Sequence, residues 1–266
     1  MANNFLVKVL NNRVDGKASV GHYYHMVADL ILPLYHSLLV EKSIGHQDTV
    51  YIRRESKLQN KLANFLPFQI RLFDKNSEVP ADVITIKYRM GFPQMRKKFT
   101  PELAHEIQRN IFEINGVTYN PEPSKILMIK REVPQKFMPS KKANTGLNRR
   151  SIPNFDKLHQ KLSEIYPDRV VYRSLEDLSV KEQCDIFNDT NVLIAQHGAA
   201  LVNNLLMSPG SVVYEIVSHG LPFFIRTSEV MEHRHLLFPQ KNPNSHIHIP
   251  TFLNYFKINY NRGSKT

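Results

Sequence analysis

The segment 192–215 carries the residues whose types and spacing best suit the binding of a ligand. An apolar run, "VLIA", is followed by "QHGAALVNN". If the run is a strand of a parallel sheet, Gly198 and the next helix N-terminus offer backbone N–H groups just beyond its carboxyl end. Ala199 and Ala200 leave this backbone open to close approach, and His197 could donate a hydrogen bond. The pattern favours an anion site, such as a site for a phosphate.

Glu215 lies one predicted strand later, in "SVVYEIV". A carboxylate at the same sheet edge could accept two hydrogen bonds from a vicinal diol such as a ribose. The alternative is that "HGAA" is only a tight turn and that Glu215 is a solvated side chain, because short glycine motifs often match by chance. Spacing alone leaves both interpretations open.

Basic residues lie where they could complete an anion site. Lys130 and Arg131 close one predicted strand, and Arg149 and Arg150 precede the next predicted helix. In a parallel sheet both places open at the edge that carries His197, and the polar loop between them could cover a ligand. The alternative is a solvated basic loop.

A second pair of chemically active residues lies in "GHYYHMVADL", near the start of the chain. His25 and Asp29 are four residues apart, so on a helix they share one face. A carboxylate or imidazole held beside an acceptor hydroxyl can take its proton as the hydroxyl attacks. The alternative is a structural pair, whose polar groups are hydrogen-bonded within the core or cap the helix.

Signals for a metal ion or a reactive thiol are weak. The pairs His233/His235 and His246/His248 could each share a strand face, but neither has a cysteine or a well-spaced carboxylate nearby. No Asp-x-Asp pair is present to hold Mg²⁺ or Mn²⁺ on a diphosphate, so we expect no metal and no cofactor. A diphosphate would instead need Lys, Arg and helix N-termini. The single cysteine, Cys184, is expected to be a buried structural thiol.

The elements that must position these residues alternate along the chain. Predicted strands cover 48–54, 82–88, 125–132, 169–175, 191–198 and 211–217, and predicted helices cover 23–40, 58–67, 100–114, 153–167, 179–190 and a short segment after 198. Pro33 should kink or divide the first helix. The regular alternation after residue 124 implies a parallel sheet with helices on both faces.

We expect an α/β protein of two domains. The first covers 1–120, and the second covers 121–235. The tail, 236–266, is expected to pack back on the first domain, and its basic end, "YFKINYNRGSKT", to be loose.

The composition is that of a basic globular protein. The 266 residues carry 35 Lys and Arg against 24 Asp and Glu, a net charge of +11. The basic residues are dispersed in pairs, which suits a phosphate-bearing ligand more than a basic tail. The chain shows no apolar run of signal-peptide or membrane-span length, so we expect no membrane span and a cytoplasmic location.

The same residues resemble the family 61 glycosyltransferases. That family's pattern reads roughly "HGAGLTN", an apolar stretch, "PPG" and "VVEI", and this chain has "HGAALVNNLLMSPGSVVYEI". "KILMIKRE" and "NRRSIPN" resemble the family's strand and arginine-rich loop, and "YHMVADLILPL" resembles its H-x-x-x-D/E element. Ala200, Val202 and Ser208 depart from the family's glycine, threonine and proline.

The resemblance implies a GT-B fold, in which two Rossmann-like domains with parallel sheets face a central cleft. In that fold 1–120 would be the acceptor side and 121–235 would bind the nucleotide-sugar. The resemblance also implies an inverting reaction without a metal, with Asp29 as catalytic base and His25 beside it. The residues that it assigns to the nucleotide-sugar are Lys130, Arg131, Arg150, His197, Gly198, Ala199, Ala200 and Asn203, with Glu215 on the ribose.

We therefore expect a glycosyltransferase that moves a sugar from UDP-xylose or, next, UDP-GlcNAc to a hydroxyl of a glycan or glycoprotein. The viral or bacterial members of the family are the most similar in length. Two alternatives stay open. A nucleic-acid-binding protein would explain the charge, but no recognised module is present, so nucleic acid is not an expected partner. A phosphate-ester hydrolase would need a nucleophile or metal that the sequence does not offer.

Overall fold

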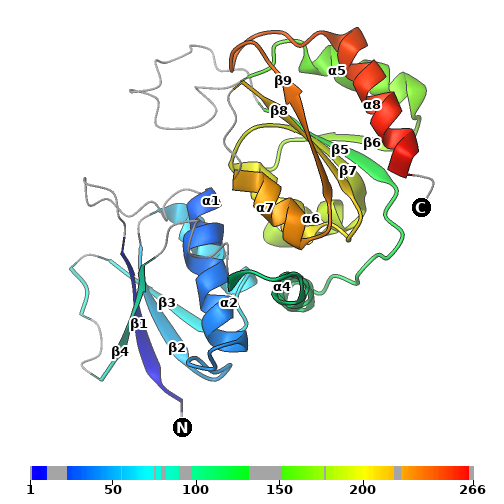
Figure 1. Cartoon of the computed structure of the whole chain (residues 1–266). Coiled ribbons are helices and arrows are strands. Elements are labelled where there is room, and N and C mark those ends of the chain that lie inside the picture. Colours follow the sequence, from blue (N-terminus) through cyan, green and yellow to red (C-terminus); the bar gives the residue numbers. More distant parts are fainter. Residues whose placement is uncertain are drawn as a thin grey trace.

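The computed structural model describes residues 2–10, 23–54, 56–74, 76–78, 82–89, 98–131, 151–176, 178–218 and 223–263. The chain forms two separate β-sheets, and every strand pair in both sheets is parallel. Helices lie between the two sheets and on the far face of the second sheet (Figure 1). The prediction of an α/β fold with parallel sheets is therefore confirmed. No helix in the described ranges is long and apolar enough to cross a membrane.

The first sheet has four strands in the order β3-β2-β1-β4. They are β1 (Asn4–Leu10), β2 (Thr49–Arg53), β3 (Gln69–Phe73) and β4 (Ile84–Arg89). The 3₁₀ helix η3 (Lys57–Asn64) connects β2 to β3 where the sequence predicted an ordinary helix. The sequence analysis predicted β2 and β4 but neither β1 nor β3.

The helix that carries His25 and Asp29 is divided into three parts. It runs as α1 (Tyr23–Met26), a π-helical turn η2 (Val27–Ile31) and α2 (Leu32–Leu39). Within the π turn, the Leu32 N–H bonds to the Val27 carbonyl, five residues back. Pro33 stands in the first turn of α2 and has no N–H for the α-helical bond to the carbonyl of Asp29. The predicted division near Pro33 is confirmed, and it takes the form of a π turn around Asp29.

The second sheet has five strands in the order β6-β5-β7-β8-β9. Its strands are β5 (Lys125–Ile129), β6 (Val170–Arg173), β7 (Thr190–Gln196), β8 (Val212–Val217) and β9 (Arg234–Pro239). Its helices are α5 (Phe155–Ile165), α6 (Val180–Asn188), η5 (Ala199–Leu206), α7 (Phe223–Val230) and α8 (Ile249–Gly263). The predicted β–α alternation over 125–217 is confirmed, with η5 as a 3₁₀ helix.

The neighbouring strands β5 and β7 send the chain to opposite faces of this sheet. Leu158 of α5 packs with Met128 and Ile194 on one face, whereas Leu205 of η5 packs with Leu127 and Leu193 on the other. Figure 1 shows α5 and α8 on one side of the sheet and α6 and α7 on the other. Such a reversal opens a crevice beyond the carboxyl ends of the two strands, which is where open α/β sheets bind ligands.

The last part of the chain differs from the expectation. Residues 234–239 form β9, which pairs with β8, so the expected boundary after 235 cuts through a strand. The tail forms helix α8, and its Phe252 and Phe256 pack on Tyr214 of the second sheet, not on the first. The expected loose end is helical through Gly263 because these rings give the helix an apolar face.

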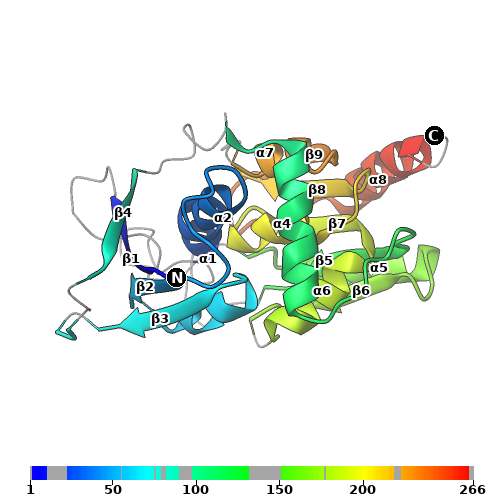
Figure 2. The ribbon, with the colours of Figure 1, turned by 90° about the horizontal axis from the view of Figure 1, so that it is seen from below.

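The two sheets share one hydrophobic core. A continuous cluster of buried side chains runs from Val50 of the first sheet through Leu34 and Ile107 to Leu193 of the second. Helix α4 (Pro101–Ile114) lies along this junction (Figure 2), and its Thr100 cap accepts a hydrogen bond from Leu103 N–H at 3.3 Å. The two parallel sheets agree with the predicted architecture, and the GT-B arrangement stays a prediction.

Candidate active site

The predicted pair on the first helix is formed in the structure. His25 Nδ1 lies 2.7 Å from Asp29 Oδ2, and the two side chains are 27% and 11% exposed. Within the described part of the chain, His25 is the one residue that donates a hydrogen bond to this carboxylate. The other oxygen, Oδ1, can therefore accept a proton from a molecule bound beside the helix.

His197 and Glu215 also form a pair, across the neighbouring strands β7 and β8. His197 Nδ1 contacts Glu215 Oε1, and His235 Nε2 of β9 lies 2.7 Å from Glu215 Oε2. The Glu215 side chain is 1% exposed. Its place differs from the expectation, because the carboxylate is enclosed and both oxygens already accept a hydrogen bond.

Hydrogen bonds extend this cluster away from the sheet edge. His235 Nδ1 lies 2.7 Å from Ser228 Oγ, and Ser228 Oγ accepts a bond of 2.8 Å from Asn204 Nδ2. Ser228 can then donate its hydroxyl proton to His235 Nδ1, which leaves the Nε2 proton of His235 for Glu215. Each bond fixes the direction of the next, so the chain of bonds holds Glu215 toward His197.

The Glu215 carboxyl is stabilised as an anion although it is buried. Burial raises its pKa, but the hydrogen bonds and the charges of His197 and His235 outweigh that effect, so its pKa is lowered. A carboxylate that accepts at Oε1 requires a proton on His197 Nδ1. The other nitrogen of that ring, Nε2, is then the atom that can serve a ligand.

Arg131 lies against the turn that follows β7. Its Nη2 lies 3.4 Å from the His197 carbonyl oxygen, which accepts its hydrogen bond. A Cβ atom at position 198 would lie 1.6 Å from that same Nη2, so a residue larger than glycine would require the guanidinium to move. The predicted meeting of the β5 and β7 ends is confirmed for Arg131 and His197, and Gly198 is explained by the close approach of the arginine.

Aromatic rings connect the two halves of the site. The ring centroids of His25 and Tyr24 are 5.2 Å apart, those of Tyr24 and Phe224 5.5 Å, and those of Phe224 and His197 5.3 Å. All three contacts are edge-to-face. Two intervening rings therefore separate the imidazole beside Asp29 from the imidazole beside Glu215, and the two pairs belong to one region of the molecule.

The remaining predicted residues take different places. Asn203 is buried, accepts a 2.7 Å bond from the Tyr23 hydroxyl and donates one of 3.0 Å to Gln183, so its side chain joins the first helix to α6. Ala199 and Ala200 are half-buried in the first turn of η5, whose first N–H groups have no partner within the helix. Arg150 lies outside the described residues.

The structure also places Cys184, His233 and His235, which gave only weak signals in the sequence. Cys184 is fully buried, and burial raises the pKa of its thiol to about 12, in agreement with a structural role. Among the described residues, no group of three or more His, Cys, Asp or Glu side chains is placed to hold a metal ion. His235 contacts Glu215, and His233 Nε2 donates to the Asn204 carbonyl at 2.9 Å.

Sequence reasoning missed Tyr24, Phe224 and the role of His235. Tyr24 stands next to a predicted residue, but nothing in its spacing indicates a ring contact with α7. The alternation of His233 and His235 was a usable signal, because it is compatible with a strand, and β9 begins at Arg234 and carries His235.

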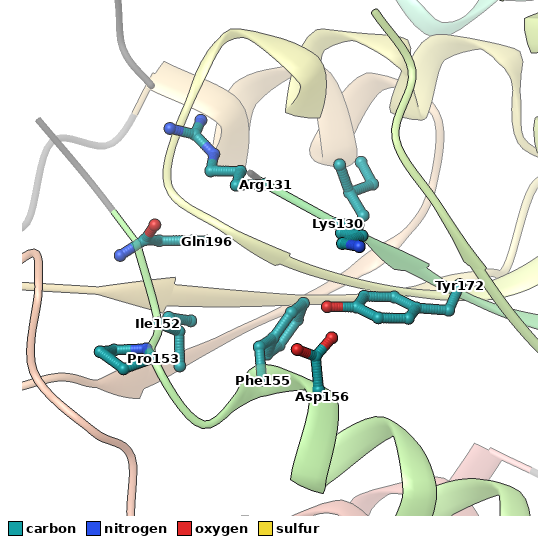
Figure 3. Close-up of a pocket in the computed structure, with 9 residues that line it drawn as sticks. Lys130, Arg131, Ile152, Pro153, Phe155, Asp156, Tyr172 and Gln196 are labelled. Carbon is teal, nitrogen blue, oxygen red and sulfur yellow. The ribbon is translucent and has the colours of Figure 1, made fainter. Parts of the chain in front are cut away.

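A pocket of about 160 Å³ opens beside Arg131, on the other side from the aromatic rings. It lies at the ends of β5, β6 and β7 and at the start of α5, so it occupies the crevice where β5 and β7 diverge. Figure 3 shows Lys130, Tyr172, Phe155 and Gln196 around it. Lys130 lies over the Tyr172 ring, 5.8 Å from its centroid.

The site thus combines a general-base candidate, a cationic sheet edge and an adjoining pocket at the ligand-binding crevice of a parallel sheet. A comparison with curated protein sequences returns no match. Residues 17–214, about three quarters of the chain, match the family described as Glycosyltransferase 61. With that match over most of its length, the chain belongs to glycosyltransferase family 61.

Proposed function

We propose that this glycosyltransferase transfers a sugar from a UDP-sugar to a hydroxyl group, with inversion at the anomeric carbon and without a metal ion. The observation that carries the proposal is the row of ring contacts from His25 through Tyr24 and Phe224 to His197. It brings a carboxylate with an open oxygen next to a cationic sheet edge. A reaction that needs a base on one side and a stabilised anion on the other suits this arrangement.

Asp29 acts as the base in this proposal. The acceptor hydroxyl gives its proton to Asp29 Oδ1 as its oxygen bonds to the anomeric carbon of the donor. The bond from that carbon to the β-phosphate oxygen breaks, and UDP leaves with the electron pair. His25, held at 2.7 Å, orients the carboxylate so that the unused oxygen faces the acceptor.

The edge at β5 and β7 stabilises the leaving diphosphate. Charge grows on its oxygens in the transition state, and fixed donors that need no reorganisation lower that barrier. The Arg131 guanidinium, His197 Nε2 and the first N–H groups of η5, at Ala199 and Ala200, can supply those donors. Lys130 and Arg150 are further cations that we propose for the nucleotide.

The role proposed for Glu215 changes with its position. The carboxylate that the sequence suggested for a ribose is enclosed and bonded to two imidazoles. We assign it as a positioning residue that fixes the Nδ1 proton of His197 and thereby aims Nε2 at the diphosphate. Asn203, bonded between Tyr23 and Gln183, holds the first helix against η5.

For the donor we favour UDP-xylose, then UDP-GlcNAc, and for the acceptor a sugar hydroxyl of a glycan or glycoprotein. The test is an assay of UDP release from each donor over a panel of glycan acceptors, with and without EDTA. We expect release with at least one donor, no loss with EDTA, and an inverted anomeric centre in the product by NMR. Inhibition by EDTA that Mn²⁺ reverses, or retained configuration, would contradict the mechanism.

A binding measurement can precede the choice of acceptor. A ligand at about 100 times its dissociation constant should add about 2.7 kcal/mol to the apparent stability. We expect UDP to raise the melting temperature without added metal. A chain stabilised by neither UDP nor pyrophosphate would rule out the proposed donor class.

A further inference from the structure

We infer that the pocket lined by Lys130, Tyr172, Phe155 and Gln196 is the subsite that binds and recognises the uracil ring of the donor. The inference rests on the proposed use of a UDP-sugar and adds the place and the chemistry of base recognition. Nucleotide-sugars share a diphosphate and differ in their base, so a grip on the phosphates alone does not select uridine.

The size of the pocket fits one ring and not a whole ligand. Its volume of about 160 Å³ lies below the roughly 300–1,000 Å³ of sites that enclose a complete small molecule. It adjoins Arg131, which also contacts the turn after β7. A ligand with its diphosphate at Arg131 and His197 can place its base in this pocket and its sugar toward Asp29.

The walls of the pocket are apolar and aromatic on one side. Ile152, Pro153 and Phe155 lead into the first turn of α5, and the Tyr172 ring packs edge-to-face on Phe155 with centroids 5.9 Å apart. His159 stacks on Tyr172 with centroids 4.6 Å apart and holds the ring in place. A flat heterocycle meets a preformed surface here, whereas a hydrated phosphate would lose its water against apolar groups.

Gln196 supplies a hydrogen-bond acceptor whose direction is fixed. Its Nε2 donates to Gln240 Oε1 at 2.9 Å and to the Pro243 carbonyl at 2.7 Å, and since both partners accept, the amide cannot reverse. Its Oε1 is buried, and no described residue donates to it. A buried acceptor without a donor is costly, and a ligand N–H in the pocket would remove that cost.

The chemistry of the pocket matches the edge of uracil. That edge presents an N–H between two carbonyl oxygens, so the N–H can donate to Gln196 Oε1 while one oxygen accepts from the Lys130 ammonium. Cytosine has a lone pair at the ring nitrogen in question, which would face the lone pairs of Oε1. The pocket therefore favours uracil over cytosine, although the two rings have nearly the same shape.

The exposed carboxylate of Asp156 lines the same pocket at the start of α5 (Figure 3). An acceptor at this rim can bind the hydroxyls of a ribose attached to the base. This places next to the base pocket the diol contact that the sequence suggested for the enclosed Glu215.

The experiment measures the dissociation constants of UDP, CDP and pyrophosphate by calorimetry, for the wild-type chain and for Gln196→Met. We expect the wild type to bind UDP at least about tenfold more tightly than CDP. The substitution keeps the length of the side chain and removes the acceptor, so it should abolish this preference and leave pyrophosphate binding unchanged. Gln160→Met, on the exposed side of α5, is the matched control.

A second variant covers the case in which Gln196→Met does not fold. Pro153→Phe places a ring at the exposed rim of the pocket and should weaken UDP and CDP alike, without effect on pyrophosphate. A preference for UDP that persists in folded Gln196→Met, UDP and CDP affinities that Pro153→Phe leaves unchanged, or a wild type that binds UDP and CDP equally, overturns the base subsite but not the proposed function. A chain that binds neither nucleotide nor pyrophosphate overturns the proposed function itself.

Discussion

The chain contains two imidazole–carboxylate pairs that look alike in chemistry and differ in their surroundings. His25 and Asp29 lie one turn apart on a single helix, and Asp29 keeps one oxygen open. His197 and Glu215 lie on neighbouring strands, and His235 takes the second oxygen of the carboxylate. A carboxylate with an open oxygen can accept a proton from substrate, whereas one with both oxygens bonded can only orient its neighbours.

The comparison assigns different tasks to the same two functional groups. In the first pair the acid is the reacting group and the imidazole supports it. In the second pair the imidazole faces the ligand and the acid supports it. Variants of the two acids should therefore differ in size and in kind of effect.

The largest effect is expected for Asp29→Asn, which keeps the shape and removes the base. A general base contributes roughly 10²–10⁴-fold, so kcat should fall by about that factor. The dissociation constant of UDP, measured by calorimetry, should stay within about twofold because the proposed nucleotide site does not include Asp29. A variant with full activity would show that Asp29 is not the base.

Glu215→Gln is expected to weaken the stabilisation of the leaving diphosphate by His197. An amide cannot accept from both imidazoles, so one ring must change its tautomer, and His197 loses its fixed Nδ1 proton. We expect kcat/KM to fall roughly tenfold to a hundredfold, less than the loss of a direct oxyanion donor costs.

The readout that separates positioning from mere stability is the pH profile of kcat/KM. In Glu215→Gln the profile should change, and in the exposed control Glu164→Gln it should not. A lower melting temperature with an unchanged profile and unchanged kcat/KM would reduce Glu215 to a structural residue.

A smaller change, confined to the sheet edge, is expected from Gly198→Ala. The new Cβ would meet Arg131 Nη2 at 1.6 Å, so the guanidinium must move away. We expect UDP to bind about tenfold more weakly in calorimetry. Gly45→Ala is the control, because its Cβ would meet Asp48 Oδ2 at an ordinary 3.4 Å. Unchanged UDP affinity in Gly198→Ala would mean that Arg131 does not hold the diphosphate.

The smallest effect concerns His233, the buried imidazole beside the second pair. Burial lowers its pKa to about 4, and its Nδ1 has no partner among the described residues. Between about pH 6.5 and 4 the unfolded chain binds the extra proton, so the free energy of unfolding should fall with falling pH, by up to about 3 kcal/mol. Glu215, whose pKa is lowered, loses its contribution only at lower pH, as its own carboxyl protonates.

His233→Gln keeps a donor for the Asn204 carbonyl and removes the titration. Urea unfolding at pH 7 and pH 4.5 should show a smaller difference for this variant than for the wild type. His246→Gln, at an exposed histidine, should leave the difference as it is. If the free energy of unfolding falls equally in all three proteins between pH 7 and pH 4.5, His233 is not the cause of the loss.

The parts of this molecule that sequence reasoning reached are the local ones. The spacing of His25 and Asp29 predicts their contact because a helix repeats on a fixed period. The first four strands of the second sheet, β5 to β8, follow from short patterns in the same way. The place of Arg131 beside His197 follows from one further rule, the common edge of parallel strands.

The parts it did not reach depend on distant partners. The edge strand β3 has one β-branched residue, Ile70, and exposed positions, so its pattern alone is weak. The enclosure of Glu215 requires His235, which arrives on β9 only after the register with β8 is set. The sequence of helix α8 alone indicates a basic tail. Its apolar face is recognised only when the sheet face that Phe252 and Phe256 cover is known.

The π turn around Asp29 has a consequence for how this family member could change. One extra residue fits into a single helical turn there, so deleting a residue between Val27 and Ile31 would restore α-helical winding. The segment before the deletion would then rotate by about 100° about the helix axis relative to α2. Tyr24 and His25 would then lose their aromatic neighbours. The length of this turn therefore determines the direction in which these two side chains point relative to α2.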